Sequence, residues 1–268
     1  MRRLLLLLLL ALPLAAATAT LDGGKIHYMA AGKGSETVVL IHGWTCDHTL
    51  WEPQIKALAR RYRVIALDLP GHGKSDPAPD YSMKRFARAV EAVMRAAGVP
   101  RATLAGHSMG GVVMLEFARL YPKKVAAIVA VDAMYPSQAE SAAFTAYAAR
   151  FQGADALANR EKMVRGMFTE ATTPETRALI EKVMLGAPPA TSAGAMLGMA
   201  DTSAWTDDTH DLPFLQIAAA TSQYLTEEGM KRRFPRATLV RIPGTGHFLQ
   251  FEKPAEVNQV LLDWLAKR

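Results

Sequence analysis

The sequence predicts an α/β protein with one mostly parallel central sheet, helices on both faces of the sheet, and a helical insertion. The first observation is that short apolar runs rich in β-branched residues recur along the chain, which is typical of buried strands. The second is that most of these runs are separated by segments with apolar residues three and four positions apart, which is typical of helices. Strands that alternate with helices favour a parallel sheet covered on both faces.

The chain begins with the pattern of a secretory signal peptide. Met1-Arg2-Arg3 is followed by leucines at 4–10 and by small residues up to Ala19, a combination typical of export signals. We expect residues 1–19 to form the signal peptide, cleaved near Ala17 or Ala19, and the mature protein to be periplasmic or secreted. An uncleaved membrane anchor is the alternative. No later run has the roughly 18 apolar residues that a membrane span needs, so we expect no stable span after cleavage.

Length and composition favour one domain with a large core. The chain has 268 residues, of which 50% are hydrophobic, and one α/β domain can reach this length. The formal charge of +6 at pH 7 falls to about +4 without Arg2 and Arg3, which does not imply a nucleic-acid partner. Cys46 is the only cysteine, so no internal disulfide can form and stability must come from packing. The sequence indicates no particular oligomeric state.

The predicted elements follow one another in order along the chain. We expect strands at Thr37–Ile41, Arg63–Leu67, Ala102–Ala105, Ala127–Val131, Pro213–Ala218 and Ala237–Ile242, with helices at Lys84–Ala97, Met109–Tyr121 and Pro254–Lys267. His42, Asp68, Ser108 and Asp132 each come directly after a predicted strand. Because the carboxyl ends of parallel strands meet at one edge of a sheet, we expect these side chains at that edge. His247 follows the last strand by a few residues.

One segment interrupts this alternation. From Pro136 to about Trp205 there is no strand-like run, but there are helix-like segments rich in Ala, Met and Phe. We therefore predict the first part of the core at 20–136, a helical insertion at 137–205 and the second part of the core at 206–268.

The most informative motif is Gly106-His107-Ser108-Met109-Gly110, which lies between a predicted strand and a predicted helix. A serine becomes a nucleophile when a sharp turn exposes it within reach of a base and of backbone N–H donors. Glycines two positions before and after the serine let the strand and the helix pack closely around that turn. The spacing by itself is also typical of an ordinary glycine-rich turn, so the surrounding motifs must decide.

Two further motifs supply candidate partners for Ser108. His42-Gly43-Trp44 follows a predicted strand, where a tight turn can aim the Trp44 N–H at an oxyanion; the Met109 N–H at the helix start would be the second donor. Pro243-Gly244-Thr245-Gly246-His247 is a glycine-rich loop that presents a histidine late in the chain. Taken alone, each segment also fits a purely structural role, as a strand-ending turn or a partly buried histidine.

Other ligand sites lack support in the sequence. Gly73-Lys74-Ser75 resembles the end of a phosphate-binding loop, but that motif needs a glycine where this chain has Asp68. No histidine pair has H-E-x-x-H spacing, and no acidic loop has calcium-binding spacing. We therefore predict neither a cofactor nor a metal.

Taken together, His42-Gly43-Trp44, the segment from Asp68 to Asp76, the Ser108 motif and Gly244-Thr245-Gly246-His247 resemble the α/β-hydrolase superfamily over nearly all of the mature chain. The resemblance implies a catalytic Ser108 and His247, in the chain order that such a triad requires. Relatives that act as dehalogenases or epoxide hydrolases use an aspartate nucleophile, so Ser108 disfavours those reactions.

The third member of the triad departs from the family pattern. The family usually carries an aspartate after the strand predicted at Pro213–Ala218, but this chain has Ser222 there. We take Asp132 as the best substitute, because it ends a strand and resembles the acid position of some lipases and dehalogenases in this superfamily. A loop-ordering role for Asp132 stays open, and Glu227 and Glu228 are the next candidates.

These inferences lead to a functional hypothesis: an exported serine hydrolase that cleaves a carboxylic ester or a similar small-molecule acyl substrate without a cofactor. Lactone or amide hydrolysis, perhydrolysis, a lyase step or a non-catalytic binding role on the same fold are the alternatives. The insertion would form a lid over Ser108. Apolar side chains from the lid could line an acyl pocket, although most of them are expected to pack the lid on the core: Phe144, Phe151, Met163, Met167, Phe168, Met184, Met196 and Met199.

Overall fold

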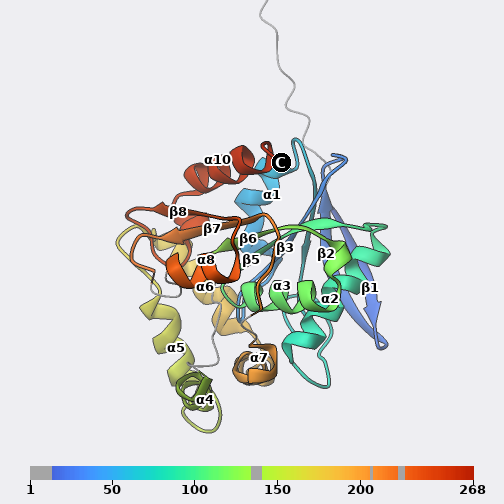
Figure 1. Cartoon of the computed structure of the whole chain (residues 1–268). Helices are drawn as coiled ribbons and strands as arrows, with labels where there is room; N and C mark the ends of the chain where they lie inside the picture. The colour runs from blue at the N-terminus through green and yellow to red at the C-terminus, as the bar shows by residue number, and fades with distance from the viewer. Residues whose placement is uncertain (1–13, 134–140, 206–207, 223–226) are drawn as a thin grey trace, which may run out of the picture.

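The computed structural model describes residues 14–133, 141–205, 208–222 and 227–268. Its centre is an eight-stranded sheet in the order β1-β2-β4-β3-β5-β6-β7-β8. Helices cover both faces of this sheet (Figure 1). The fold class expected from the sequence is therefore confirmed.

All six predicted strands are present and run parallel to one another. They are β3 (Thr37–Ile41), β4 (Arg63–Leu67), β5 (Ala102–His107), β6 (Val125–Val131), β7 (Phe214–Ala219) and β8 (Ala237–Ile242). β3, β5 and β7 are buried along their whole length. Strands that are buried on both faces read as continuous apolar runs, which is why the sequence pattern located them.

Two strands were not predicted. β1 (Ala15–Leu21) and β2 (Gly24–Ala31) form an antiparallel hairpin, and β2 pairs antiparallel with β4. β1 is rich in alanine and threonine, so its small residues resemble the end of a signal peptide. The predicted boundary between residues 19 and 20 consequently falls inside β1, and residues 1–13 lie outside the described part of the chain.

The helices on the two faces bury separate apolar clusters. On one face, α2 (Met83–Ala96), α3 (Met109–Leu120) and α8 (Glu227–Arg233) pack through residues such as Phe86 and Phe117. On the other face, α1 (Glu52–Leu58), α9 (Leu249–Glu252) and α10 (Pro254–Leu265) pack through residues such as Leu58 and Leu261. The described residues also contain the short 3-10 helices η1 (His48–Trp51), η2 (Pro122–Lys124) and η4 (Thr202–Ala204).

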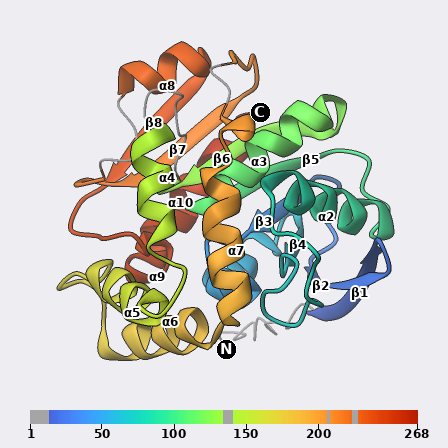
Figure 2. The same ribbon diagram turned by 90° about the horizontal axis from the view of Figure 1, so that it is seen from below.

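Between β6 and β7, the described residues form the α-helices α4 (Ser141–Ala149), α5 (Ala156–Gly166), α6 (Pro174–Gly186) and α7 (Pro189–Ala200). Figure 2 views the molecule from the side on which these helices gather. The Trp44 indole Nε1–H donates to the backbone oxygen of Ser192 over 2.8 Å, and the Thr191 hydroxyl donates to the backbone oxygen of Gly71 over 3.0 Å. These bonds join α7 to the loops at the carboxyl edge of the sheet. The predicted domain limits at 136/137 and 205/206 fall at residues 134–140 and 206–207, outside the described residues.

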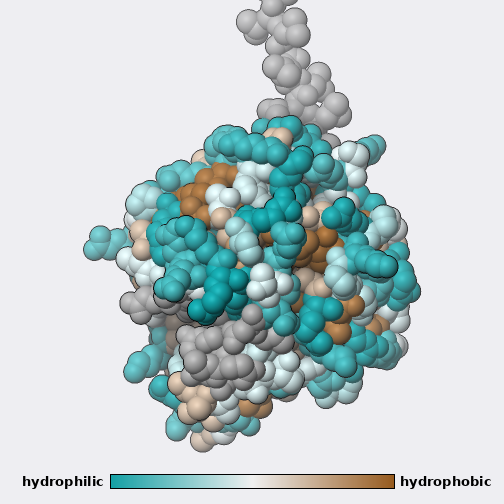
Figure 3. All heavy atoms as spheres, viewed as in Figure 1, coloured by the Kyte–Doolittle hydropathy of each residue, from teal (hydrophilic) through white to brown (hydrophobic). Residues whose placement is uncertain are grey.

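On the face seen in Figure 3, hydrophilic side chains dominate and the apolar residues form separate patches. Among the described residues, no helix has both the length and the apolar character that a membrane span requires.

Candidate active site

Ser108 occupies a strained turn between β5 and α3. Its φ of 52° and ψ of −119° lie outside the regions that side chains normally allow. The backbone on the two sides of this turn approaches closely, because a Cβ on Gly106 would lie 2.4 Å from the Gly110 carbonyl oxygen. A Cβ on Gly110 would lie 2.3 Å from the Ile41 oxygen. The two glycines of the motif are therefore needed for close backbone approach, which explains the spacing seen in the sequence.

His247 and Asp132 meet although 115 residues separate them. His247 Nδ1 lies 2.7 Å from Asp132 Oδ2, and both side chains are buried. Because a carboxylate only accepts hydrogen bonds, this contact places the imidazole proton on Nδ1 and leaves Nε2 as the basic nitrogen. Such a pair can act as an oriented general base.

Hydrogen bonds from several neighbours hold the Asp132 carboxylate in place. Its φ of 41° is left-handed, and its Oδ1 accepts a hydrogen bond from the Ala219 N–H over 3.2 Å. Burial opposes ionisation, but hydrogen bonds from His247 and Ser222 outweigh burial, so the pKa of Asp132 lies below its ordinary value. Ser222, which stands where the family usually has its aspartate, therefore supports the carboxylate that pairs with the histidine.

The two rival carboxylates have other environments. Glu227 is exposed at the start of α8 and pairs with Lys231 over 2.8 Å, and Glu228 is exposed beside it. The described contacts of His247 with a carboxylate are those with Asp132.

Ser108 and His247 line the same cavity, which has a volume of about 250 Å³. We call it the Ser108 cavity. The described contacts include no hydrogen bond between the two side chains. Catalytic hydrogen bonds are often long in a protein without substrate and tighten when substrate binds.

The Ser108 cavity is mostly apolar. Its lining comprises Gly43, Trp44, Cys46, His107, Ser108, Phe144, Tyr147, Met163, Met167, Met184, Met196, Met199, His247 and Phe248. Six of the eight insertion residues proposed for an acyl pocket are therefore present in the wall. Phe151 instead packs its ring against the Trp44 indole, and Phe168 packs against the Arg177 guanidinium.

The two backbone N–H groups expected to bind an oxyanion are free to do so. Within the described part of the chain, neither the Trp44 N–H nor the Met109 N–H donates to a protein acceptor. A Cβ on Gly43 would lie 3.1 Å from the Ser108 Cβ, so the turn that carries Trp44 passes directly beside the serine. Unpaired N–H groups beside a nucleophile can stabilise negative charge on a substrate oxygen.

The supporting roles of two residues, His107 and Glu252, were not identified from the sequence. The His107 ring Nε2 lies 2.9 Å from the backbone oxygen of His247, so it holds the histidine loop. Burial, followed by the nearby His247, lowers the pKa of His107 to about 3, and its ring is neutral. Glu252 accepts hydrogen bonds from the Gly246 N–H and from the Thr172 hydroxyl, and so connects the histidine loop to the helical insertion. His107 lies inside the Ser108 motif and Glu252 lies five residues after His247, but neither position indicates the distant partner that defines its role.

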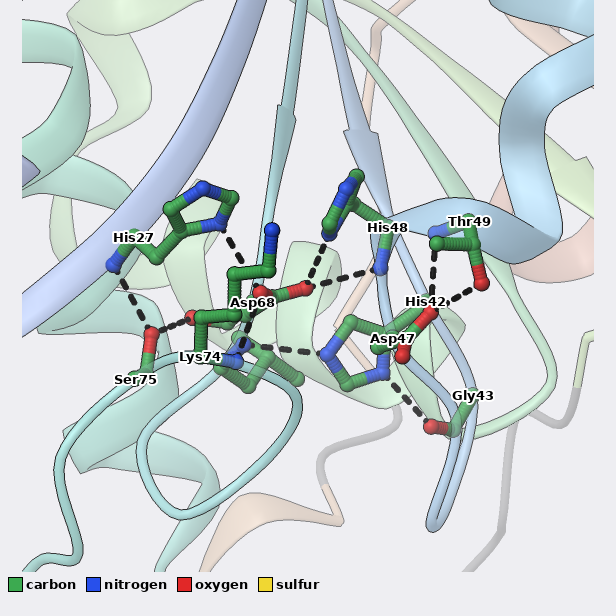
Figure 4. Close-up of polar contacts among 10 residues, drawn as sticks. His27, His42, Gly43, Asp47, His48, Thr49, Asp68, Lys74 and Ser75 are labelled. Atoms are coloured by element: carbon green, nitrogen blue, oxygen red, sulfur yellow. Dashed lines mark hydrogen bonds and ion pairs between the residues drawn. The ribbon is translucent and has the colours of Figure 1, made fainter. Parts of the chain in front are cut away.

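Asp68 is the centre of a buried polar network next to the Trp44 turn (Figure 4). Its Oδ1 accepts the backbone N–H of His48 at 2.8 Å and lies 2.7 Å from His48 Nδ1. Its Oδ2 accepts the Lys74 N–H at 2.9 Å and lies 2.9 Å from His27 Nδ1. Burial opposes ionisation, but the contacts with His48 outweigh it and hold the pKa of Asp68 well below its usual range. The network joins β2, η1 and the loop after β4.

His42 links this network to the Trp44 turn. Its Nδ1 lies 2.8 Å from the Gly43 carbonyl oxygen, and its Nε2 accepts the Leu69 N–H over 3.0 Å. These partners fix one neutral tautomer, and burial lowers the pKa of the ring. The contacts of the motif residues His42 and Asp68 therefore indicate that they position the turn beside Ser108.

The same network contains a group of side chains of the kind that can bind a metal ion. The ligand atoms of His27, His48 and Asp68 lie within 4.8 Å of one another. Each Asp68 oxygen already has two nitrogen partners at hydrogen-bond distance. The Asp68 carboxylate is thus already satisfied by hydrogen bonds within the protein.

Comparison with known proteins identifies relatives over most of the chain. A family model described as the α/β hydrolase fold matches residues 36–180. The chain is 31% identical to the dihydrolipoyllysine-residue acetyltransferase component of the acetoin cleaving system from Pseudomonas putida, covering 91% of this chain and 68% of that protein. It covers only 40% of the corresponding component from Cupriavidus necator.

Two further proteins align over nearly their whole length. The chain is 26% identical to (E)-2-((N-methylformamido)methylene)succinate hydrolase from Acinetobacter baylyi, covering 89% of this chain and 93% of that protein. The structure of a thermophilic esterase from Thermogutta terrifontis with malate bound is similar, with a TM-score of 0.78 and 28% identity. That superposition covers 95% of this chain and 98% of the esterase.

Proposed function

The chain belongs to the α/β-hydrolase fold family, and on this basis we propose that it is a serine hydrolase that cleaves a carboxylic ester or similar acyl substrate through an acyl-enzyme. The observation that carries this proposal is the combination of a strained Ser108 with a carboxylate-paired histidine in the wall of one cavity. An esterase and a succinate-derivative hydrolase among the similar proteins agree with hydrolysis at a carbonyl group.

In the proposed reaction, the Ser108 oxygen attacks the substrate carbonyl carbon while His247 Nε2 takes the proton from the Ser108 hydroxyl. The N–H groups of Trp44 and Met109 donate to the resulting oxyanion. The protonated His247 then gives its proton to the leaving alcohol, and the ester bond breaks to leave an acyl-enzyme. Water, deprotonated by His247, attacks the acyl-enzyme and releases the carboxylic acid and free Ser108. Asp132 stabilises the imidazolium in both steps.

The helical insertion acts as a lid in this proposal. Its methionines and aromatic residues form much of the Ser108 cavity, and methionine side chains adapt to ligands of different shape. A cavity of about 250 Å³ favours a small or medium acyl group.

The test uses the purified protein, a fluorophosphonate label and p-nitrophenyl esters of graded chain length, with a lactone and an amide alongside. We expect labelling at Ser108 and ester hydrolysis that is lost in Ser108→Ala. Preferred turnover of the lactone or the amide would redirect the proposal to those reactions. A serine that never reacts with the label, with no turnover of any substrate, would favour a binding protein on a hydrolase fold and would overturn the enzymatic proposal.

We also propose that the protein is exported, on the basis of its basic and leucine-rich start. Fractionation of cells that express the full chain should recover a shortened protein outside the cytoplasm. A full-length protein in the cytoplasm would contradict export.

A further inference from the structure

A second hollow adjoins the Ser108 cavity on the side of α4 and α5. It has a volume of about 360 Å³ and is lined by Tyr147, Arg150, Phe151, Asn159, Lys162, Met163, Gly166 and Met167. We call it the outer hollow. Tyr147, Met163 and Met167 line both spaces. These three side chains therefore form the boundary between the two spaces, and a ligand that reached from the Ser108 cavity into the outer hollow would have to pass them.

The two spaces differ in charge. The lining of the Ser108 cavity contains no Lys, Arg, Asp or Glu, whereas the charged residues lining the outer hollow are Arg150 and Lys162, both cationic and exposed. In the described part of the chain, neither of them forms an ion pair. Glu161, which precedes Lys162 in the sequence, instead has its carboxylate 3.6 Å from the Arg165 guanidinium. The same guanidinium lies 3.2 Å from the Glu181 carboxylate. The positive charge at the outer hollow is thus not neutralised by the acidic residues of α5 and α6.

Local contacts hold Arg150 at the hollow, and the geometry of α5 places Lys162 there. The Arg150 guanidinium carbon lies 5.8 Å from the centroid of the Tyr147 ring, over the ring face. The side-chain amide of Asn159 donates a hydrogen bond to the Arg150 backbone oxygen over 2.8 Å. On α5, Asn159, Lys162, Met163 and Gly166 are spaced three, four and seven residues apart and so share one helix face. This face turns Lys162 toward the hollow beside Met163, which also lines the Ser108 cavity.

We propose that the substrate has an acyl chain with an anionic group at its far end, which binds at Arg150 and Lys162 while the apolar part of the chain crosses Tyr147, Met163 and Met167. The inference rests on the proposed ester hydrolysis at Ser108. A guanidinium matches a carboxylate with two parallel hydrogen bonds, and a lysine adds a second positive charge. The apolar residues between the serine and the cations suit methylene groups rather than a polar linker.

The test compares mono-p-nitrophenyl esters of dicarboxylic acids of graded length with the corresponding neutral methyl p-nitrophenyl diesters. We expect the full-length wild-type enzyme to prefer the charged ester at the chain length that reaches the outer hollow. In Arg150→Gln/Lys162→Gln, the ratio of kcat/KM for the charged ester to that for the neutral ester should fall about three- to tenfold, mainly through KM, as exposed ion pairs allow. Arg165→Gln is the matched control, because it removes another exposed cation that already has acidic partners. Its ratio should stay at the wild-type value.

Salt gives a second readout on the unmodified enzyme. Between about 0.01 M and about 1 M salt the screening length falls from about 30 Å to about 3 Å, so the preference for the charged ester should weaken. Hydrolysis of neutral esters with no charge preference, or a preference unaffected by both the double substitution and salt, would overturn this inference and leave the proposed function intact. Failure to hydrolyse either ester faster than Ser108→Ala would instead remove the proposed function, and this inference with it.

Discussion

The reactivity expected of Ser108 depends on side chains and backbone groups that come from four different loops. The strained turn after β5 presents the hydroxyl, the loop after β8 supplies His247, and the loop after β6 supplies Asp132. The turn after β3 supplies the Trp44 N–H. Each group is ordinary by itself, and only their convergence at the carboxyl edge of the sheet makes acyl chemistry feasible.

The substitution Asp132→Asn tests the assignment of the acid. An asparagine at this position would keep the shape of the side chain but lose the charge that holds the His247 Nδ1–H and stabilises the imidazolium. We expect kcat for a p-nitrophenyl ester to fall by up to about 10⁴-fold, as for the equivalent change in a serine protease of another fold. Circular dichroism should show an unchanged fold.

Glu227→Gln is the matched control for that experiment. Glu227 is exposed and pairs with Lys231, so kcat should stay near the wild-type value. Unchanged turnover in Asp132→Asn, with loss in Glu227→Gln, would reverse the assignment.

His48 should make stability depend on pH. Burial lowers the pKa of this histidine, but its hydrogen bond to Asp68 and the Asp68 charge outweigh burial and raise the pKa above the ordinary value of 6.5. The protonated ring therefore contributes stability fully below the ordinary value, and that contribution is lost as the pH rises through the folded value. His48→Gln should lower the free energy of unfolding more at about pH 5.5 than at about pH 9 in urea titrations.

His210 gives the opposite control for the pH experiment. Burial and then the Arg233 charge lower the pKa of His210, so its protonation opposes folding as the pH falls. The free energy of unfolding of His210→Gln, relative to that of the wild-type protein, should therefore rise as the pH falls from about 9 to about 5.5. A His48→Gln variant with the same loss of stability at both pH values would refute the proposed charge coupling.

At the scale of elements, the N-terminal strand limits where the proposed signal peptide can be cleaved without loss of core packing. β1 pairs with β2 along its whole length, and Ala19 is 3% exposed within the apolar cluster on the α2 and α3 face. Ala15 and Ala16, which precede it, are exposed. Removal of the first residues of β1 therefore costs little burial, whereas removal of Ala19 exposes part of the core.

If the protein is exported as proposed, we expect cleavage after Ala17 rather than after Ala19. The mature protein would then begin at Thr18 and keep Ala19 paired with Ile26. Intact mass and N-terminal sequencing of the exported protein measure this directly. A mature start at Thr20 would show that the sheet tolerates the loss of most of β1.

The inserted helices are the element that shapes the candidate site. Six side chains from α4, α5, α6 and α7, or from the residue after α5, reach the Ser108 cavity alongside Tyr147. Helical periodicity alone did not separate the side chains that face the cavity from those that pack elsewhere. The arrangement of the helices over the sheet decides that division.

At the scale of the whole molecule, packing rather than cross-linking must provide stability. The chain has a single cysteine, and Cys46 is 2% exposed in the core beside the Ser108 cavity. Burial, followed by the nearby Asp47 charge, raises the pKa of the Cys46 thiol. The thiol is therefore both shielded and protonated in the folded protein.

A thiol reagent should thus report global unfolding. We expect an aromatic disulfide reagent to label the native protein far more slowly than a free cysteine, with the labelled fraction rising along the urea unfolding curve. Cys46→Ala serves as the blank. Rapid labelling of native protein at the rate of free cysteine would mean that the Ser108 cavity opens widely to solvent.

The parallel core was predictable because its signals are local. Strands that are buried on both faces are continuous apolar runs, and the glycines at 106 and 110 are required by close backbone contacts around the motif. The β1 and β2 hairpin was not predictable, because half-buried antiparallel strands of small residues carry a weak pattern. The supporting roles of Glu252 and His107 were not predictable for a different reason, since each has a partner that lies far away in the sequence.

The sequence alone determined the fold class, the turn that presents Ser108 and the order in which serine and histidine occur, because these depend on neighbouring residues and on strand-end positions. Only the tertiary structure decided that His247 meets Asp132, that Ser222 supports this carboxylate, and that Arg150 and Lys162 line a hollow next to the Ser108 cavity. Such contacts depend on how the loops at the carboxyl ends of separate strands and the inserted helices come together in space. No local pattern of residues encodes that arrangement.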